Sequence, residues 1–134
     1  MNFLKTLIVA CGLCLAGSSW AAGDPLFINV TSDPQLHRTE MALGFAANVL
    51  KKDHPVTVFL NDLAVKAATK AAANSTTGKL LADVMKAGGT VIVCPMCMKH
   101  YGVKESDLLP GLKVGNPDLT GGVLFKDNTR TLSW

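Results

Sequence analysis

Charged residues are scarce in this chain of 134 residues, and the sequence has none of the basic clusters that usually accompany nucleic-acid binding. Asp, Glu, Lys and Arg make up 17% of the residues, the formal net charge is only +3, and no basic run is longer than Lys51 and Lys52. A nucleic-acid footprint needs basic side chains gathered on one face. Hydrophobic residues reach 49%, a proportion that excludes disorder and predicts a folded core.

Cysteine is also rare, and two of the four cysteines lie in a segment that we expect to be removed. Residues 1–22 have the layout of a secretory signal peptide, with Lys5, an apolar stretch over residues 7–16, and small residues that favour cleavage after Ala21. The alternative is a bacterial lipobox ending at Cys11, although the segment before this cysteine is short. The domain at residues 23–134 would then be exported, periplasmic or secreted and free of the membrane.

Two enzyme signatures are missing. No glycine-rich phosphate cradle follows the first apolar run, which leads instead into Thr31, Ser32, Asp33 and Pro34. No Gly-x-Ser-x-Gly elbow occurs, so a hydrolase of that kind is unsupported. The sequence implies no cofactor.

Short apolar runs alternate with segments of helical pattern along the rest of the chain. Buried strands are predicted at residues 26–30, 56–60 and 90–93, with a further extended piece at residues 112–114. Such alternation is typical of βαβ units, so we expect an α/β domain with a mostly parallel sheet and helices on both faces.

The helices are predicted from their apolar spacing and their end signals. They cover residues 35–52, residues 79–86 and a segment that begins at Cys94 and ends at Gly102. Asp33 is expected to cap the first of them. The alanine-rich residues 63–73 are helix-prone, residues 74–78 interrupt them as a flap, and residues 123–125 form either a hairpin with residues 131–132 or a helix.

The carboxyl edge of a parallel sheet is where ligands bind. Asp33 follows the first predicted strand, Asn61 and Asp62 follow the second, and Cys94 follows the third. This edge is therefore the predicted site, and it contains the cysteine pair.

Cys94 lies where a strand passes into a helix, with Pro95 at the first helical position. The amides of the helix N-terminus favour a thiolate at such a place. Cys97 lies one turn along the same helix and can resolve an oxidised or persulfidated Cys94 by closing a disulfide. The alternative is that buried cysteines act as small hydrophobic residues.

Two other functions fit the same segment. Thiolate, thioether and imidazole ligands select Cu(I), so Cys94 and Cys97 could bind a soft metal with help from Met98 or His100. We expect Met96 and Met98 to pack in the core. A thiol–disulfide role is the third possibility, because the Cys-x-x-Cys spacing permits it.

Residues 91–115 resemble the DsrE/DsrF-like family of sulfur-relay proteins. They supply a strand, a cysteine at its end, a short helix closed by Gly102 and Val103, and an acidic-Leu-Leu-Pro-Gly segment, in the family's order. The resemblance implies a flavodoxin-like, three-layer α/β domain with a five-stranded sheet, in which residues 119–126 form a helix and residues 129–132 the last strand. It also implies a homo-oligomer, often a trimer or hexamer, and a persulfide on Cys94.

The resulting hypothesis is a periplasmic sulfur-handling protein that is more a carrier than an enzyme with turnover. Cys94 accepts sulfane sulfur from a donor, and Cys97 acts as the resolving thiol toward an acceptor. The pocket rim is expected to contain Asp33, Asn61, Asp62 and His100, with Asp62 orienting a proton.

Overall fold

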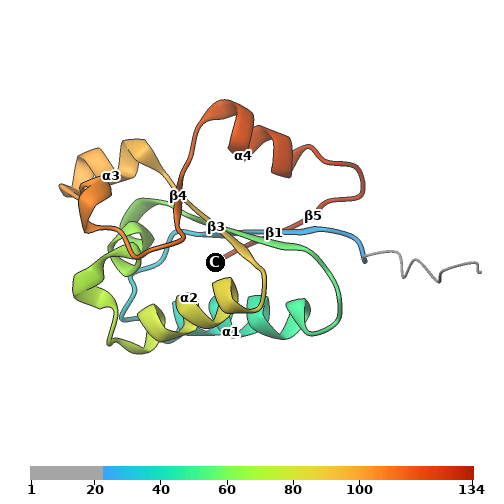
Figure 1. The fold of residues 1–134 in the computed structure, drawn as a ribbon, viewed down its shortest axis with the longest axis horizontal. Helices are drawn as coiled ribbons and strands as arrows, with labels where there is room; N and C mark the ends of the chain where they lie inside the picture. The colour runs from blue at the N-terminus through green and yellow to red at the C-terminus, as the bar shows by residue number, and fades with distance from the viewer. Residues whose placement is uncertain (1–22) are drawn as a thin grey trace, which may run out of the picture.

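The computed structural model describes residues 23–134, which form one α/β domain built on a five-stranded sheet (Figure 1). The predicted signal peptide at residues 1–22 lies outside the described residues. The strands run in the order β4-β3-β2-β1-β5 and pair in parallel throughout. Their bounds are β1 Leu26–Val30, β2 Val56–Leu60, β3 Thr90–Val93, β4 Lys113–Val114 and β5 Arg130–Ser133. The parallel five-stranded α/β fold expected from the sequence is therefore confirmed.

The helices lie on both sides of the sheet. Their bounds are α1 His37–Leu50, α2 Thr76–Lys86, α3 Pro95–Tyr101 and α4 Pro117–Leu124, with short 3-10 segments η1 Asp62–Ala68, η2 Lys70–Ala72 and η3 Glu105–Asp107. Figure 1 shows α1 and α2 on one face, α4 on the other, and α3 at one end of the sheet. None of the helices in the described part of the chain has the length and apolarity needed to cross a membrane.

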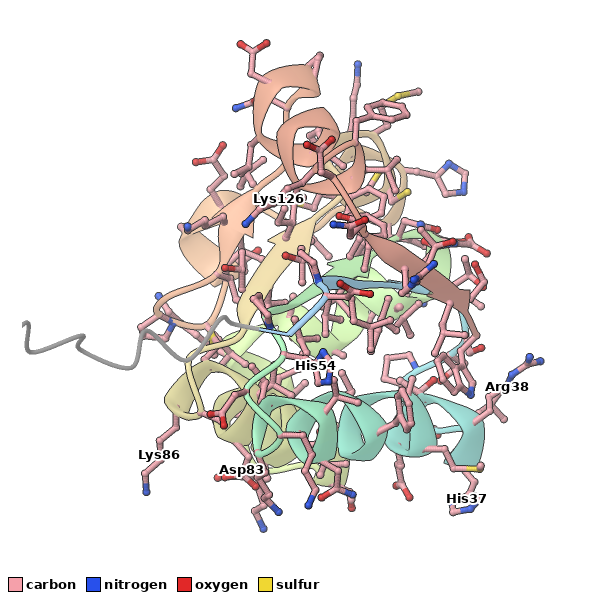
Figure 2. All side chains as sticks on the ribbon, turned by 90° about the vertical axis from the view of Figure 1, so that its right-hand side faces the viewer. His37, Arg38, His54, Asp83, Lys86 and Lys126 are labelled. Atoms are coloured by element: carbon pink, nitrogen blue, oxygen red, sulfur yellow. The ribbon has the colours of Figure 1, made fainter. Side chains whose placement is uncertain are left out.

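The core forms where alternate strand residues meet α1 and α2. Ile28, Val30, Val58 and Leu60 are fully buried, since side chains two apart on a strand share a face. Helix residues complete this core, among them Ala42, Leu43, Ala46, Leu81 and Val84. The charged side chains labelled on α1 and α2, such as Arg38, Asp83 and Lys86, project outward at separate places (Figure 2). This apolar layer fixes the strands that carry the site.

Three local predictions need correction. Asp33 does not cap α1: the N-cap position is Leu36, and Asp33 Oδ1 accepts from the Gln35 amide at 2.8 Å instead. Residues 63–73 form 3-10 segments rather than an α-helix, because Ala64, Val65, Ala67 and Ala68 are all buried against the core. Residues 74–78 are not a flap, since α2 begins at Thr76.

Ser75 explains why α2 starts earlier than predicted. Its hydroxyl accepts from the Gly78 amide at 3.0 Å and donates to the Ala72 carbonyl at 2.7 Å. A serine N-cap of this kind satisfies amides that the helix leaves free. The segment between η2 and α2 is therefore a capped junction.

The C-terminal part has the arrangement that the family resemblance implied. Residues 117–124 form α4, and β5 pairs in parallel with β1, so the alternative hairpin is wrong. Asn116 caps α4 by accepting from the Leu119 amide at 2.8 Å. The crossover through α4 places β5 at the edge of the sheet, beside β1.

Candidate functional site

Cys94 joins the sheet to α3. Its amide donates to the Leu60 carbonyl at 2.9 Å, and its own carbonyl accepts from the Met98 amide at 2.9 Å. It is the N-cap of α3, Pro95 occupies the first helical position, and Gly102 ends the helix with φ 71°. Proline and glycine at these two positions suit the start and end of a helix. The backbone of Cys94 is thus held from both sides.

The two sulfurs of the pair are in contact. Cys94 Sγ lies 2.9 Å from Cys97 Sγ, whose thiol is placed to donate to it, and Cys94 Sγ also accepts from the Cys97 amide at 3.4 Å. Both cysteines are free and half-buried. Burial raises the pKa of the Cys97 thiol, and its hydrogen bond to Cys94 raises it further. Within the pair, Cys97 is the hydrogen-bond donor and Cys94 Sγ is the acceptor.

Asp62 approaches the pair from the end of β2. The Asp62 backbone lowers the pKa of Cys97, against the larger effect of burial, which raises it. Its backbone is left-handed, with φ 47°. Asn61 precedes it and is fixed to β1, through its amide on the Val30 carbonyl at 2.9 Å and its side chain on Asn29. The ends of β1, β2 and β3 thus meet at this edge.

Two residues that the sequence did not single out complete the surroundings of Asp62. The Tyr101 hydroxyl donates to Asp62 Oδ1 at 2.5 Å, and this bond raises the pKa of Tyr101. Lys66 Nζ lies 5.0 Å from the centre of the Tyr101 ring. His100 packs edge-on against Tyr101 with ring centres 4.7 Å apart, and its side chain is exposed. The spacing of Cys97 and Tyr101, four residues apart on a helix, was the available signal.

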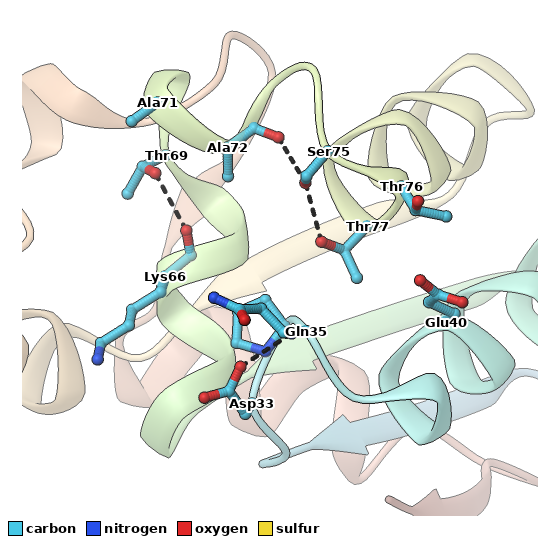
Figure 3. A pocket seen from close by; sticks show the side chains of 11 residues that line it. Asp33, Gln35, Glu40, Lys66, Thr69, Ala71, Ala72, Ser75, Thr76 and Thr77 are labelled. Atoms are coloured by element: carbon cyan, nitrogen blue, oxygen red, sulfur yellow. Dashed lines mark hydrogen bonds between the residues drawn. The ribbon is translucent and has the colours of Figure 1, made fainter.

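Asp33 belongs to a separate groove of about 620 Å³ between the β1–α1 loop, η1 and the start of α2 (Figure 3). Lys66, Thr69, Ser75 and Thr77 also line it, whereas neither cysteine does. Figure 3 shows Asp33 and Lys66 on one side and Thr77 on the other. The four predicted rim residues therefore do not share one pocket: Asp62 contacts Cys97, Asn61 bonds to β1, His100 faces Tyr101, and Asp33 lines this groove.

The methionines of α3 differ in their surroundings. Met98 is 4% exposed and packs in the core, as expected, whereas Met96 is 80% exposed, so its predicted burial is wrong. Helix geometry explains the difference, since residues two apart on a helix face opposite sides. Across residues 23–134, no group of three or more His, Cys, Asp or Glu side chains is placed to hold a metal ion together.

The fold and the site together define a single-domain parallel α/β protein with a Cys-x-x-Cys pair at the carboxyl edge of its sheet. The chain belongs to the DsrE/DsrF-like family, whose sequence model matches residues 24–121. It is 35% identical over 98 residues to the uncharacterized protein MJ0989 of Methanocaldococcus jannaschii, an alignment that covers 70% of this chain and 86% of that protein.

Solved structures show the same fold at lower identity. The ychN protein of E. coli superposes with a TM-score of 0.73 and 15% identity, covering 84% of this chain and all 100% of that one. MTH1491 of Methanobacterium thermoautotrophicum, a protein of unknown function, gives 0.67 and 13%, with 83% and 100% covered. BT1422 of Bacteroides thetaiotaomicron gives 0.64 and 22%, with 87% and 99% covered. These similarities concern the architecture alone.

Proposed function

We propose that this protein is an exported sulfur carrier in which Cys94 holds sulfane sulfur as a persulfide and Cys97 is the resolving thiol. Membership of the DsrE/DsrF-like family supports a sulfur-relay type of function. The observation that carries the assignment of roles is the pair geometry: Cys94 Sγ accepts from both the amide and the thiol of Cys97. A thiolate is the nucleophile in sulfur transfer, so we assign that role to Cys94, the sulfur of the pair that accepts.

The loading step conserves atoms and charge. The Cys94 thiolate attacks the outer sulfur of a donor persulfide, R–S–SH, and a new S–S bond forms as the donor's S–S bond breaks. The electron pair leaves on R–S⁻, which takes a proton from solvent. Cys94 then carries –S–SH, and no net oxidation or reduction has occurred.

The release step uses Cys97. Its thiol loses a proton to solvent, and the thiolate attacks Cys94 Sγ, which is 2.9 Å away before sulfur is loaded. The persulfide bond breaks, hydrosulfide leaves with the electron pair, and a Cys94–Cys97 disulfide remains. The sulfane sulfur is reduced while two thiols are oxidised, so a dithiol reductant must return the pair to its starting state. Direct attack of an acceptor thiolate on the outer sulfur is the route that avoids the disulfide.

The experiment that tests the proposal is sulfur loading followed by mass spectrometry. The reduced protein and its Cys94→Ser and Cys97→Ser variants are exposed to polysulfide or thiosulfate, and alkylated peptides are mapped. We expect added sulfur on Cys94 of the unmodified protein, a longer-lived adduct in Cys97→Ser, and none in Cys94→Ser. Sulfur on Cys97 alone, or only an unmodified disulfide, would overturn the assignment.

Export and self-association are parts of the same proposal. We propose that the mature chain begins near Ala22, which N-terminal sequencing of protein recovered from a bacterial periplasm would test. We further propose a homo-oligomer, in line with the family resemblance; exposed apolar side chains near β5, namely Phe45 of α1 at 43% and Leu132 at 39%, support it. Light scattering at several concentrations measures the assembly directly, and a monomer at all of them would refute this part.

A thiol–disulfide role is the second candidate, because the two sulfurs need to close only from 2.9 Å to the bonded distance of about 2.05 Å. The measured reduction potential tests the redox role, and sulfur loading tests the carrier role. A pair that cycles readily with a dithiol donor yet never gains sulfur is a redox pair. A pair that gains sulfur on Cys94 in the Cys97→Ser variant is a carrier, since that variant forms no internal disulfide.

A further inference from the structure

One residue of the β2–η1 turn reaches two side chains of α3. The carboxylate of Asp62 accepts from the Tyr101 hydroxyl, and the backbone of Asp62 lies close enough to Cys97 to lower the pKa of its thiol. Cys97 and Tyr101 are four residues apart, so they lie on the same face of the helix one turn from each other. Asp62 therefore spans the interval between them with its backbone at one end and its side chain at the other.

The turn at Asp62 needs support to keep this shape. A left-handed backbone, here φ 47°, is unfavourable for a residue that carries a side chain. The chain before it is tied to β1 by Asn61, and the Ala64 amide donates to the Asn61 carbonyl at 3.1 Å just after it. The Tyr101 bond joins the side chain of Asp62 to α3, whereas these two bonds join the turn to β1 and to η1.

Tyr101 is itself held on its other side. Lys66 lies one turn further along η1 and places its ammonium 5.0 Å from the ring centre, and the His100 ring packs edge-on against it. A cation over an aromatic face is attracted by the ring quadrupole. The hydrogen bond to Asp62 raises the pKa of Tyr101, so the hydroxyl remains a donor across the neutral pH range. The ring is thus fixed from η1 at two points.

We propose that Tyr101 is a positioning residue for the cysteine pair: by holding the Asp62 carboxylate, it keeps the Asp62 amide directed at the Cys97 sulfur. The inference rests on the proposed function, in which Cys97 must become a thiolate to resolve the persulfide. Burial and three neighbouring groups, namely Cys94, the Asp62 carboxylate and the Asp62 backbone, affect the ionisation of Cys97. Burial raises its pKa, Cys94 and the Asp62 carboxylate raise it further, and the Asp62 backbone lowers it.

The first test is the pH profile of Cys97 alkylation in a Cys94→Ser background, followed by peptide mapping so that other cysteines do not interfere. Adding Tyr101→Phe removes only the hydroxyl, and the midpoint of the profile should move up by roughly half a unit to one unit, the effect of one hydrogen bond. Asp62→Asn is the matched control: its amide oxygen still accepts from Tyr101 and its charge is gone, so its midpoint should stay or move down.

The second test follows release in the protein with both cysteines. Tyr101→Phe should slow the appearance of hydrosulfide by roughly threefold to tenfold at fixed pH while sulfur loading on Cys94 is unchanged. An unmoved alkylation midpoint in Tyr101→Phe, with unfolding and circular dichroism like the parent, would overturn the positioning role. Failure of Cys94 to gain sulfur would refute the proposed function instead, because the alkylation profile needs no sulfur donor.

Discussion

The same substitution, glycine to alanine, is expected to have opposite effects at two helical positions. Alanine is favoured over glycine inside a helix by about 1 kcal/mol. Gly44 lies in the middle of α1, and a Cβ added there meets nothing within 4 Å. Gly44→Ala should therefore raise the free energy of unfolding by about 1 kcal/mol, or about 4 °C in Tm for a domain of this size.

Gly78, in the first turn of α2, should respond the other way. Its added Cβ would lie 2.1 Å from the Ala72 carbonyl oxygen and 2.9 Å from the carbonyl carbon, both backbone atoms. That oxygen accepts from the Ser75 amide at 2.9 Å and the Ser75 hydroxyl at 2.7 Å, so moving it breaks the bonds that hold the cap. Overpacking costs typically about 1–3 kcal/mol against a helix gain of about 1 kcal/mol, so we expect Gly78→Ala to lose up to about 2 kcal/mol.

Thermal and urea unfolding of the parent and both variants, followed by circular dichroism, measure the difference. Opposite signs are the expected result, with m-values unchanged because the folded and unfolded surfaces remain similar. Stabilisation by Gly78→Ala equal to that by Gly44→Ala would refute the packing described at the η2–α2 junction. Destabilisation by Gly44→Ala would refute the open space assigned beside α1.

Three further predictions concern pH, capping and the core. The pKa values of Cys97 and Tyr101 are raised in the folded state, so the folded state keeps these protons to higher pH than the unfolded state does. The free energy of unfolding should therefore decline as the pH rises past about 9. Urea unfolding at a series of pH values measures this decline, and Cys97→Ser should make it shallower. Asn116→Ala should cost about 1 kcal/mol in urea unfolding by removing the α4 cap, whereas Asn116→Asp should be near neutral; equal losses would show that the cap contributes nothing. Ile28→Ala should cost about 2–5 kcal/mol because the side chain is fully buried, and a loss below 1 kcal/mol by calorimetry would contradict that burial.

Local chemistry explains which elements the sequence predicted well. The β-branched run at Val56–Leu60 and the proline and glycine that bound α3 act through the conformations of their own residues, so a single sequence reveals them. The family resemblance resolved what local pattern left open at the C-terminus, where a helix and a hairpin both fitted. Long-range information was needed there, because the choice depends on β5 pairing with β1.

The failures have a common cause in contacts that single-residue preferences do not encode. The alanine-rich segment has strong helix propensity, yet its buried side chains, such as Val65, pack against the core along a 3-10 path. Asp33 is a residue type that often caps helices, but its carboxylate accepts from the Gln35 amide, which precedes α1. The polar residues around Ser75 suggest a loop, whereas its hydroxyl accepts from the Gly78 amide and caps α2.

The candidate site also contains one part that neighbouring residues predict and one part that depends on long-range contacts. The position of Cys94 at the strand-to-helix junction follows from adjacent residues, and the structure has it there. The contact between Tyr101 and Asp62 joins residues 39 positions apart and depends on how η1 lies against α3. The four-residue spacing can place Tyr101 beside Cys97 on one helix face, but no spacing rule predicts its contacts with Asp62 and Lys66, which depend on the folded arrangement.

The backbone of Cys94 is committed twice, to the sheet through Leu60 and to the helix through Met98. A residue fixed in this way cannot swing toward a partner, and the only reach it has is its own side chain. An added sulfur would lengthen that side chain by one bond of about 2.05 Å. If Cys94 carries sulfur as proposed, the molecules that deliver and collect the sulfur must therefore reach the Cys94 side chain themselves.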